Sequence, residues 1–237
     1  MDYKAKIICL QDNAHSVKMA AECVAQANKF GITVQQFSAV NGNDYNIACA
    51  KYGITSISKV KKGRLGVLGC FLSHYGLWKE CVESNIPYLI LEHDGYFIRP
   101  LPEDILTKFK HVCKLDQYDP YSGSYNHVVE KSMGEDVVVG PYHNIHAKGK
   151  RTLKYVGNYF RGAWSYIIKP EAAQKLLDFV AEHGYVVAAD QQIGSKLLEL
   201  SSTNVPVARL HPFYSIGINI NSESLTQHLG AKSEQEK

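Results

Sequence analysis

The sequence lacks several features that mark particular classes of protein. Its six cysteines include no CxxC pair and stand at Cys9, Cys23, Cys49, Cys70, Cys81 and Cys113. Several of them occupy apolar faces, so the spacing predicts buried, reduced thiols rather than a disulfide framework. Reduced thiols favour a cytoplasmic protein.

Long apolar runs are missing as well. The run in MDYKAKIICLQDN is too short for a secretion signal, and no stretch approaches the ~20 apolar residues that span a bilayer. No internal repeat or low-complexity linker divides the chain. We therefore expect a soluble, cytoplasmic protein with a single domain over residues 1–221 and a polar, frayed tail over residues 222–237.

The composition suits a globular core. Of the 237 residues, 45% are hydrophobic and 21% are charged, and the formal net charge is +3. Two basic clusters stand out: Lys59, Lys61, Lys62 and Arg64, and then Lys148, Lys150, Arg151 and Lys154. Each cluster either faces phosphates or forms a solvated loop surface, and the spacing leaves both interpretations open.

Strand-like and helix-like segments alternate along the chain, which predicts an α/β fold. Strands are predicted at residues 6–10, 33–40, 88–91, 137–139, 162–168, 205–210 and 214–220. Helices are predicted at residues 17–30, 65–85, 103–112, 172–181 and 191–200. Residues 114–150 are polar and predict a long loop region, of a kind that often forms lids or binding loops.

An acidic cluster follows the predicted strand at residues 88–91. Glu92 and Asp94 come where this apolar strand reaches its carboxyl end, the edge at which open α/β sheets bind ligands. Two carboxylates one residue apart can converge on one hard divalent cation that also binds a diphosphate. Alternatively, both carboxylates solvate the strand end and the turn that begins at Gly95.

Five short blocks follow one another in a specific order: IICLQDN, FSAVNG, LGCFLSH, LILEHD and GAWSYIIKPEAAQKLL. Together they resemble glycosyltransferase family 25, which includes lipooligosaccharide sugar transferases and collagen galactosyltransferases. The resemblance implies a GT-A type fold with a mixed, mostly parallel sheet flanked by helices. It also implies a nucleotide-sugar donor such as a UDP-sugar, a Mn²⁺ (or Mg²⁺) cofactor, and inverting transfer to a hydroxyl acceptor.

The resemblance further implies a set of donor-binding residues. They are Asp12, Asn13, Asn41, Ser73, His74, Glu92 and His93. Ser73 and His74 would bond ribose or phosphate oxygens, although Ser73 can equally satisfy local backbone groups and His74 can be a buried packing residue. His93 replaces the central acid of the family's EDD, which lowers the negative charge of the site. Gly69 and Cys70 are interpreted as small residues that permit close helix packing.

The metal ligands predicted on this basis are Glu92 and Asp94, with His211 as a late third ligand. Asp190 is the candidate base that removes the acceptor proton. Its alternative role is the N-cap of the helix predicted at residues 191–200. Trp164 and Tyr166 lie on one face of a strand, where an aromatic pair is more often part of the core than a sugar platform.

The acceptor is the least constrained part of the prediction. The resemblance implies a cell-surface saccharide, and the basic clusters allow peripheral contact with an anionic membrane face. A second possibility is a hydroxymethylated base in viral DNA, which the same basic clusters would approach. A third is a non-catalytic nucleotide-sugar or glycan-binding module, suggested by His93 in place of an acid.

Overall fold

The computed structural model of the protein describes residues 2–57, 64–115, 136–142, 160, 162–184, 188–204 and 208–209. His211, the predicted strand at residues 214–220, the tail and most of both basic clusters lie outside these described residues. The predicted contributions of those segments therefore stay predictions.

A seven-stranded mixed sheet forms the centre of the fold, with the strand order β2-β1-β3-β7-β5-β8-β6. Its strands are β1 (Lys4–Cys9), β2 (Val34–Ser38), β3 (Tyr88–Glu92), β5 (Val112–Lys114), β6 (Val139–Pro141), β7 (Ser165–Ile168) and β8 (Leu200–Thr203). A separate two-stranded sheet pairs β4 (Gly95–Tyr96) with β9 (Ala208–Arg209). The expected α/β fold with a mixed sheet is confirmed, and three of the six strand pairs in this sheet are parallel.

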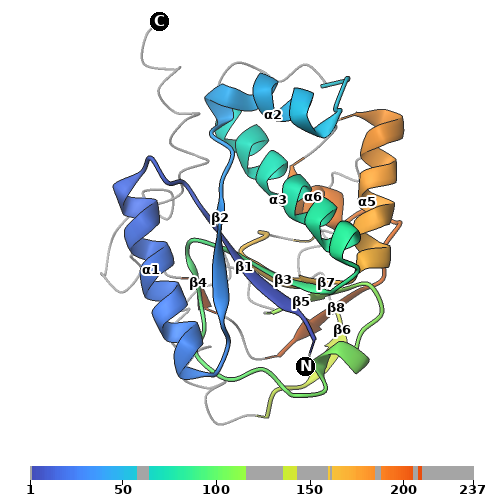
Figure 1. The fold of residues 1–237 in the computed structure, drawn as a ribbon. Coiled ribbons are helices and arrows are strands. Elements are labelled where there is room, and N and C mark those ends of the chain that lie inside the picture. Colours follow the sequence, from blue (N-terminus) through green and yellow to red (C-terminus); the bar gives the residue numbers. More distant parts are fainter. Residues whose placement is uncertain are drawn as a thin grey trace, which may run out of the picture.

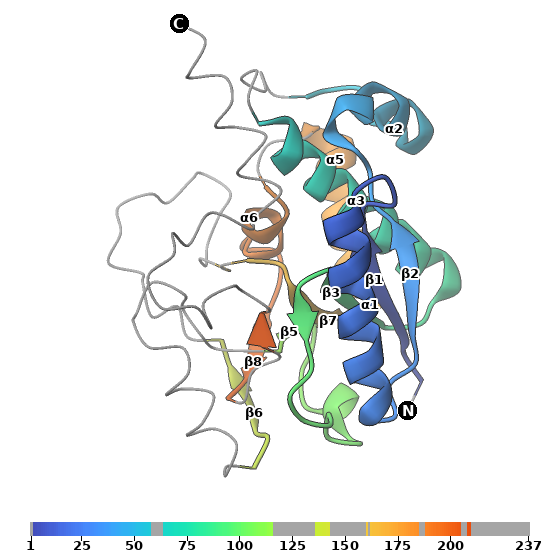
Figure 2. The ribbon, with the colours of Figure 1, turned by 90° about the vertical axis from the view of Figure 1, so that its left-hand side faces the viewer.

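The directions of the strands determine which strand ends lie at the same edge of the sheet. β1 pairs in parallel with β2 and β3, and β5 pairs in parallel with β8. β7 runs antiparallel to both β3 and β5, so those two strands point the same way. The carboxyl ends of β1, β2, β3, β5 and β8 therefore share one edge of the sheet, and the start of β7 lies there too. Figure 2 shows β2 on one side of the sheet and β6 on the other.

Helices cover both faces of the sheet (Figure 1). The helices are α1 (Ala14–Lys29), α2 (Tyr45–Tyr52), α3 (Leu65–Ser84), α5 (Pro170–His183) and α6 (Ala189–Ile193), with 3-10 turns at η1 (Gly42–Asp44) and η2 (Ile105–Thr107). One apolar cluster joins α1 to one face, and a second joins the other face to α2, α3, α5 and α6. In the described part of the chain, no helix is both long enough and apolar enough to cross a membrane.

Local sequence explains how helices α1 and α5 begin. α1 starts three residues before the predicted position because the Asn13 side chain accepts a hydrogen bond from the backbone N–H of Ser16 at 2.9 Å. α5 starts at Pro170, whose fixed φ suits the first turn of a helix and whose missing N–H costs no hydrogen bond there.

Helix α3 is buried over most of its length and packs very closely against the chain after β2. A Cβ at Gly69 would lie 2.6 Å from the carbonyl oxygen of Val40, so only glycine allows this approach. The interpretation of Gly69 as a close-packing residue is confirmed.

Two predicted helices are largely absent. The segment at residues 103–112 contains one 3-10 turn at Ile105–Thr107, and its last residue, Val112, begins β5, which pairs with β7 and β8. The segment at residues 191–200 keeps α6 only as far as Ile193, and β8 begins at Leu200. In both places the strand takes only the last residue of the predicted helix, and most of the segment is turn or irregular structure.

Candidate functional site

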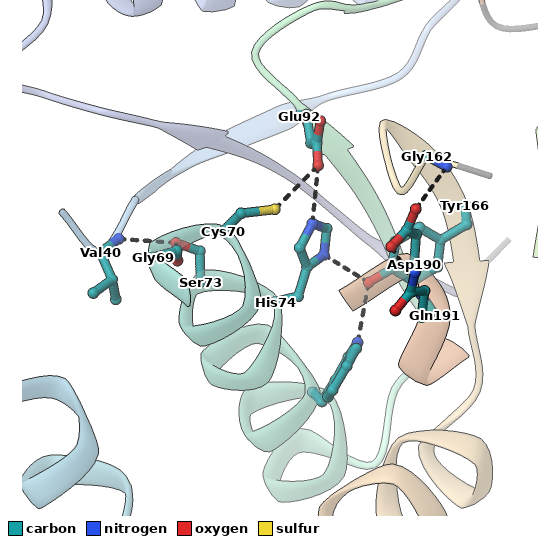
Figure 3. Close-up of polar contacts among 11 residues, drawn as sticks. Val40, Gly69, Cys70, Ser73, His74, Glu92, Gly162, Tyr166, Asp190 and Gln191 are labelled. Carbon is teal, nitrogen blue, oxygen red and sulfur yellow. Dashed lines mark hydrogen bonds and ion pairs between the residues drawn. The ribbon is translucent and has the colours of Figure 1, made fainter. Parts of the chain in front are cut away.

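Chemically active side chains gather at the shared carboxyl edge of the sheet. Glu92 ends β3, Lys114 ends β5, and Asp12 follows β1. Asp190 reaches the same region from α6, where its Oδ2 accepts a hydrogen bond from the backbone N–H of Gly162 at 3.2 Å (Figure 3). The edge expected to bind ligands therefore carries three carboxylates and one ammonium group.

A buried chain of hydrogen bonds leads from the interior to Glu92 (Figure 3). The indole Nε1 of Trp78 donates to the hydroxyl of Tyr166 at 3.0 Å, and that hydroxyl lies 2.8 Å from Nδ1 of His74. Nε2 of His74 lies 3.3 Å from Oε1 of Glu92. Trp78, His74 and Tyr166 are fully buried, whereas 22% of the Glu92 side chain is exposed. This series of hydrogen bonds therefore links the buried core to Glu92, whose side chain reaches solvent.

Cys70 bonds to the same carboxylate. Its Sγ lies 3.5 Å from Oε1 of Glu92, one helical turn before His74 on α3. The ligand atoms of Cys70, His74 and Glu92 all lie within 4.8 Å of one another, and among the described residues they form the one group of three that is close enough to hold a metal ion. The interpretation of Cys70 as a packing residue therefore missed its bond to Glu92.

The Cys70 thiol is surrounded by negative charge. Burial raises the pKa of Cys70 well above its ordinary value, and the carboxylates of Glu92, Asp190 and Asp94 raise it further. Asp94 is itself only 7% exposed. The carboxylates of Glu92, Asp190 and Asp94 therefore all act on this thiol, and a cation bound near Glu92 would offset their negative charge.

Asp190 is half-buried near the start of α6. Burial raises the pKa of its carboxyl group, bonds from the backbone N–H groups of Gly162 and Gln191 lower it, and the charges of Glu92 and Lys114 act in opposite directions. The N-cap position of α6 belongs to Ala188, so the alternative role of Asp190 as N-cap is wrong. Its Oδ1 instead accepts from the N–H of the next residue, Gln191, at 2.8 Å.

Lys114 places a positive charge inside the protein. It is 1% exposed, and its Nζ lies 4.0 Å from the ring centroid of Trp164 and 5.5 Å from that of Phe160. Aromatic faces stabilise a desolvated ammonium group. Trp164 and Tyr166 are both buried, as expected of core residues, but each also contacts a polar group of the site. Nothing in the local sequence around Lys114 indicated its burial, because residues 114–150 were predicted to form a polar loop region, whereas Lys114 ends β5.

Gly162 allows the Trp164 ring to lie over this edge. Its φ is +65°, and a Cβ there would lie 1.7 Å from the Trp164 ring. The backbone N–H of the same residue holds Asp190. Gly162 therefore both leaves room for the Trp164 ring, which contacts Lys114, and holds Asp190, the candidate base, through its backbone N–H.

The predicted donor-binding residues divide into two sets. Asp12 and Asn41 meet at the ends of β1 and β2, where Nδ2 of Asn41 donates to Oδ2 of Asp12 at 3.0 Å, and Asn13 caps α1 beside them. The His93 ring lies 6.5 Å from that of His15 on α1, so His93 contacts the α1 side of the edge while Glu92 contacts α3.

Ser73 and His74 are fully buried. Ser73 Oγ accepts from the N–H of Val40 at 2.9 Å and donates to the carbonyl of Gly69 at 2.8 Å. Both residues therefore have the buried, hydrogen-bonded roles named as their alternatives, and direct donor binding by either stays a prediction.

Comparison with known proteins identifies the family. The profile of glycosyltransferase family 25, described as "LPS biosynthesis protein", matches residues 7–193, most of the chain. The chain belongs to glycosyltransferase family 25. It is also similar to the lipooligosaccharide biosynthesis protein lic2B of Haemophilus influenzae, with 27% identity over 112 residues. That match covers 47% of this chain and 40% of the relative, so the chain spans less than half the length of that protein.

Proposed function

We propose that this protein is a glycosyltransferase that moves a sugar from a nucleotide-sugar, a UDP-sugar in the first instance, to a hydroxyl group of a saccharide acceptor. Membership of family 25 supports the reaction class. The name of the relative from Haemophilus influenzae supports a lipooligosaccharide acceptor. All six cysteines are free, which supports placing this reaction in the reducing cytoplasm.

The observation that carries the proposal is the set of carboxylates at the carboxyl edge of the sheet: Glu92 ends β3, Asp94 lies in the turn that follows it, and Asp190 lies near the start of α6. The charges of all three raise the pKa of the Cys70 thiol. Oxygen donors suit Mn²⁺ or Mg²⁺, and Glu92 and Asp94 are the residues that would hold such an ion. When bound, it would supply charge neutralisation for the departing nucleoside diphosphate.

The chain's own residues supply the remaining steps of the proposed mechanism. Asp12 and Asn41 bind the nucleoside at the ends of β1 and β2. Asp190 removes the proton from the acceptor hydroxyl on the face opposite the leaving group, so the configuration at the sugar inverts. Two backbone N–H groups fix the Asp190 carboxylate in place. The buried ammonium of Lys114 favours its ionised form.

The test is a screen of the purified protein against UDP-, GDP- and CMP-sugars, with and without Mn²⁺, by thermal shift and nucleotide release. The expected result is stabilisation and Mn²⁺-dependent release with a UDP-sugar. Asp94→Asn should reduce release at least ~100-fold, since the lost charge stabilisation amounts to several kcal/mol. Asp104→Asn is the control, because Asp104 pairs with Lys108 on an exposed turn.

Three outcomes would count against parts of the proposal. Full activity of Asp94→Asn would remove Asp94 from the metal site. Nucleotide-sugar binding without release under any condition would indicate a non-catalytic binding module. Transfer to hydroxymethylated DNA in preference to saccharides would replace the proposed acceptor.

A further inference from the structure

Every proton in the buried chain from Trp78 to Glu92 can be assigned from its donors and acceptors. The Trp78 indole N–H can only donate, so Tyr166 Oη accepts at that contact. The Tyr166 hydroxyl has one proton of its own. Among the described residues it has one further partner, Nδ1 of His74 at 2.8 Å. Burial raises the pKa of Tyr166 well above its ordinary value, so the hydroxyl keeps that proton.

The direction of the Tyr166 bond fixes the state of the His74 ring. If Tyr166 donates, Nδ1 is the acceptor and the ring proton of the neutral imidazole is on Nε2. That N–H then donates to Oε1 of Glu92 at 3.3 Å. The opposite tautomer would direct two N–H groups at Tyr166 and leave the buried hydroxyl proton of Tyr166 without an acceptor among the described residues, which is unfavourable.

Donors and acceptors can be matched in the same way at Oε1 of Glu92. It accepts from His74 Nε2–H and from the Cys70 thiol at 3.5 Å, which occupies both lone pairs of that oxygen. Any cation that Glu92 binds while these two bonds hold is therefore bound through Oε2. The hydrogen bonds among Trp78, Tyr166 and His74 therefore determine which carboxylate oxygen of Glu92 is available to a cation.

We propose that Tyr166 and His74 are positioning residues that hold Glu92 with Oε1 bonded to α3 and so restrict it to single-oxygen binding of a divalent cation. The part that concerns the cation rests on the proposed function, whereas the proton assignment does not. Removal of such outer partners costs ~10–100-fold in metal affinity or activity in other metal sites.

A zinc site made by Cys70, His74 and Glu92 is the competing arrangement. Tetrahedral zinc with these ligands would place sulfur and oxygen about 3.5 Å apart and nitrogen and oxygen about 3.3 Å apart. The observed separations are the same, because hydrogen bonds have similar lengths. Zinc would require Nε2 and Sγ to lose their protons, and the Tyr166 proton would again lack an acceptor among the described residues. The hydrogen-bonded chain fits better.

The first test is nitrogen NMR of the wild-type protein labelled with ¹⁵N-histidine, with the His74 signals assigned by their loss in His74→Gln. The expected state is neutral, with the proton on Nε2. A proton on Nδ1, or on both nitrogens, overturns the assignment. Stoichiometric zinc in the purified protein that is lost in Cys70→Ser also overturns it. This experiment needs no substrate and no active enzyme.

The second test measures Mn²⁺ binding by electron paramagnetic resonance of the free ion. Tyr166→Phe is expected to raise the Kd for Mn²⁺ about tenfold. Tyr75→Phe, which removes one hydroxyl from a largely buried tyrosine of α3, should leave the Kd unchanged. His74→Gln retains an N–H for Glu92 and should bind Mn²⁺ better than His74→Leu. Equal Kd values for Tyr166→Phe and Tyr75→Phe, or for the two His74 variants, overturn the positioning role.

Absence of Mn²⁺ binding to the wild type would overturn the cation half of this proposal, together with the metal part of the proposed function. The tautomer of His74 would then decide separately whether the hydrogen-bond chain stands.

Discussion

The two sides of the carboxyl edge are built in different ways. On the β1–β2 side, Asp12 is exposed and bonds to Asn41 at the surface. On the β3–α3 side, Glu92 is bonded to groups that are buried in the core. An exposed polar pair adds little to stability, whereas a buried chain fixes geometry and is costly to interrupt. Substitutions on the β1–β2 side should therefore alter ligand contacts without disturbing the fold. Substitutions on the β3–α3 side should disturb both.

The largest expected effect comes from Asp190→Asn. This substitution keeps the shape of the side chain but removes its basicity, so transfer should fall by ~10²–10⁴-fold while Mn²⁺ affinity stays close to wild type. The melting temperature should fall slightly, because the amide group can accept only one of the two hydrogen bonds from Gly162 and Gln191. Initial-rate assays at saturating donor would measure it. The control is Asp178→Asn on α5, where the exposed carboxylate pairs with Gln174. A similar loss in both variants would show that the effect of Asp190 is not specific.

The next prediction tests how much the contact between Gly162 and Trp164, on the buried side, contributes to stability. Gly162 and Gly31 both have positive φ, but a Cβ at Gly162 would meet the Trp164 ring whereas one at Gly31 has nothing within 4 Å. Gly31→Ala should cost ~1 kcal/mol of unfolding free energy from backbone strain alone. Gly162→Ala should cost ~3 kcal/mol and also disturb Asp190. Urea denaturation would separate them, and equal costs would mean that the Trp164 contact contributes nothing.

A pH experiment isolates the charge of Lys114. Lys114 lowers the pKa of Asp190, so Lys114→Met should let that pKa rise. The base must be ionised to act, and the acid limb of the transfer rate should therefore move to higher pH, with the greatest loss of rate at acid pH. Lys110→Met, which removes an exposed lysine paired with Glu199, should leave the limb in place. A shift to lower pH would contradict the assignment of Asp190 as the base.

The smallest effect belongs to the exposed side. Asp12→Ala should raise the KM for the nucleotide-sugar by ~3–10-fold, the equivalent of one hydrogen bond, and change unfolding free energy by no more than ~0.5 kcal/mol. Gln11→Ala is the control, because Gln11 bonds to Gln36 on the same side. A stability loss as large as that of Gly162→Ala would show that the two sides of the edge do not differ as described.

Local pattern accounted for much of the fold. The apolar run before Glu92 is β3, and the periodic apolar residues of α1, α3 and α5 are helices close to their predicted bounds. Strands β5 and β8 were both missed, because a strand of three or four residues has too few positions to show a period of two. β5 and β8 form because their backbone groups pair with strands that are distant in the sequence.

The sequence by itself determined the α/β class, the family and the position of Glu92 and Asp94 at a strand end, because apolar periodicity and ordered motifs are local properties. Only the tertiary structure decided that His74 bonds to Tyr166, 92 positions away, that Lys114 is buried against Trp164, and that Asp190 joins Gly162. Those contacts depend on strand order and direction. Hydrogen bonds and charge interactions act over a few ångströms in space, and the linear sequence does not state which distant residues will come that close.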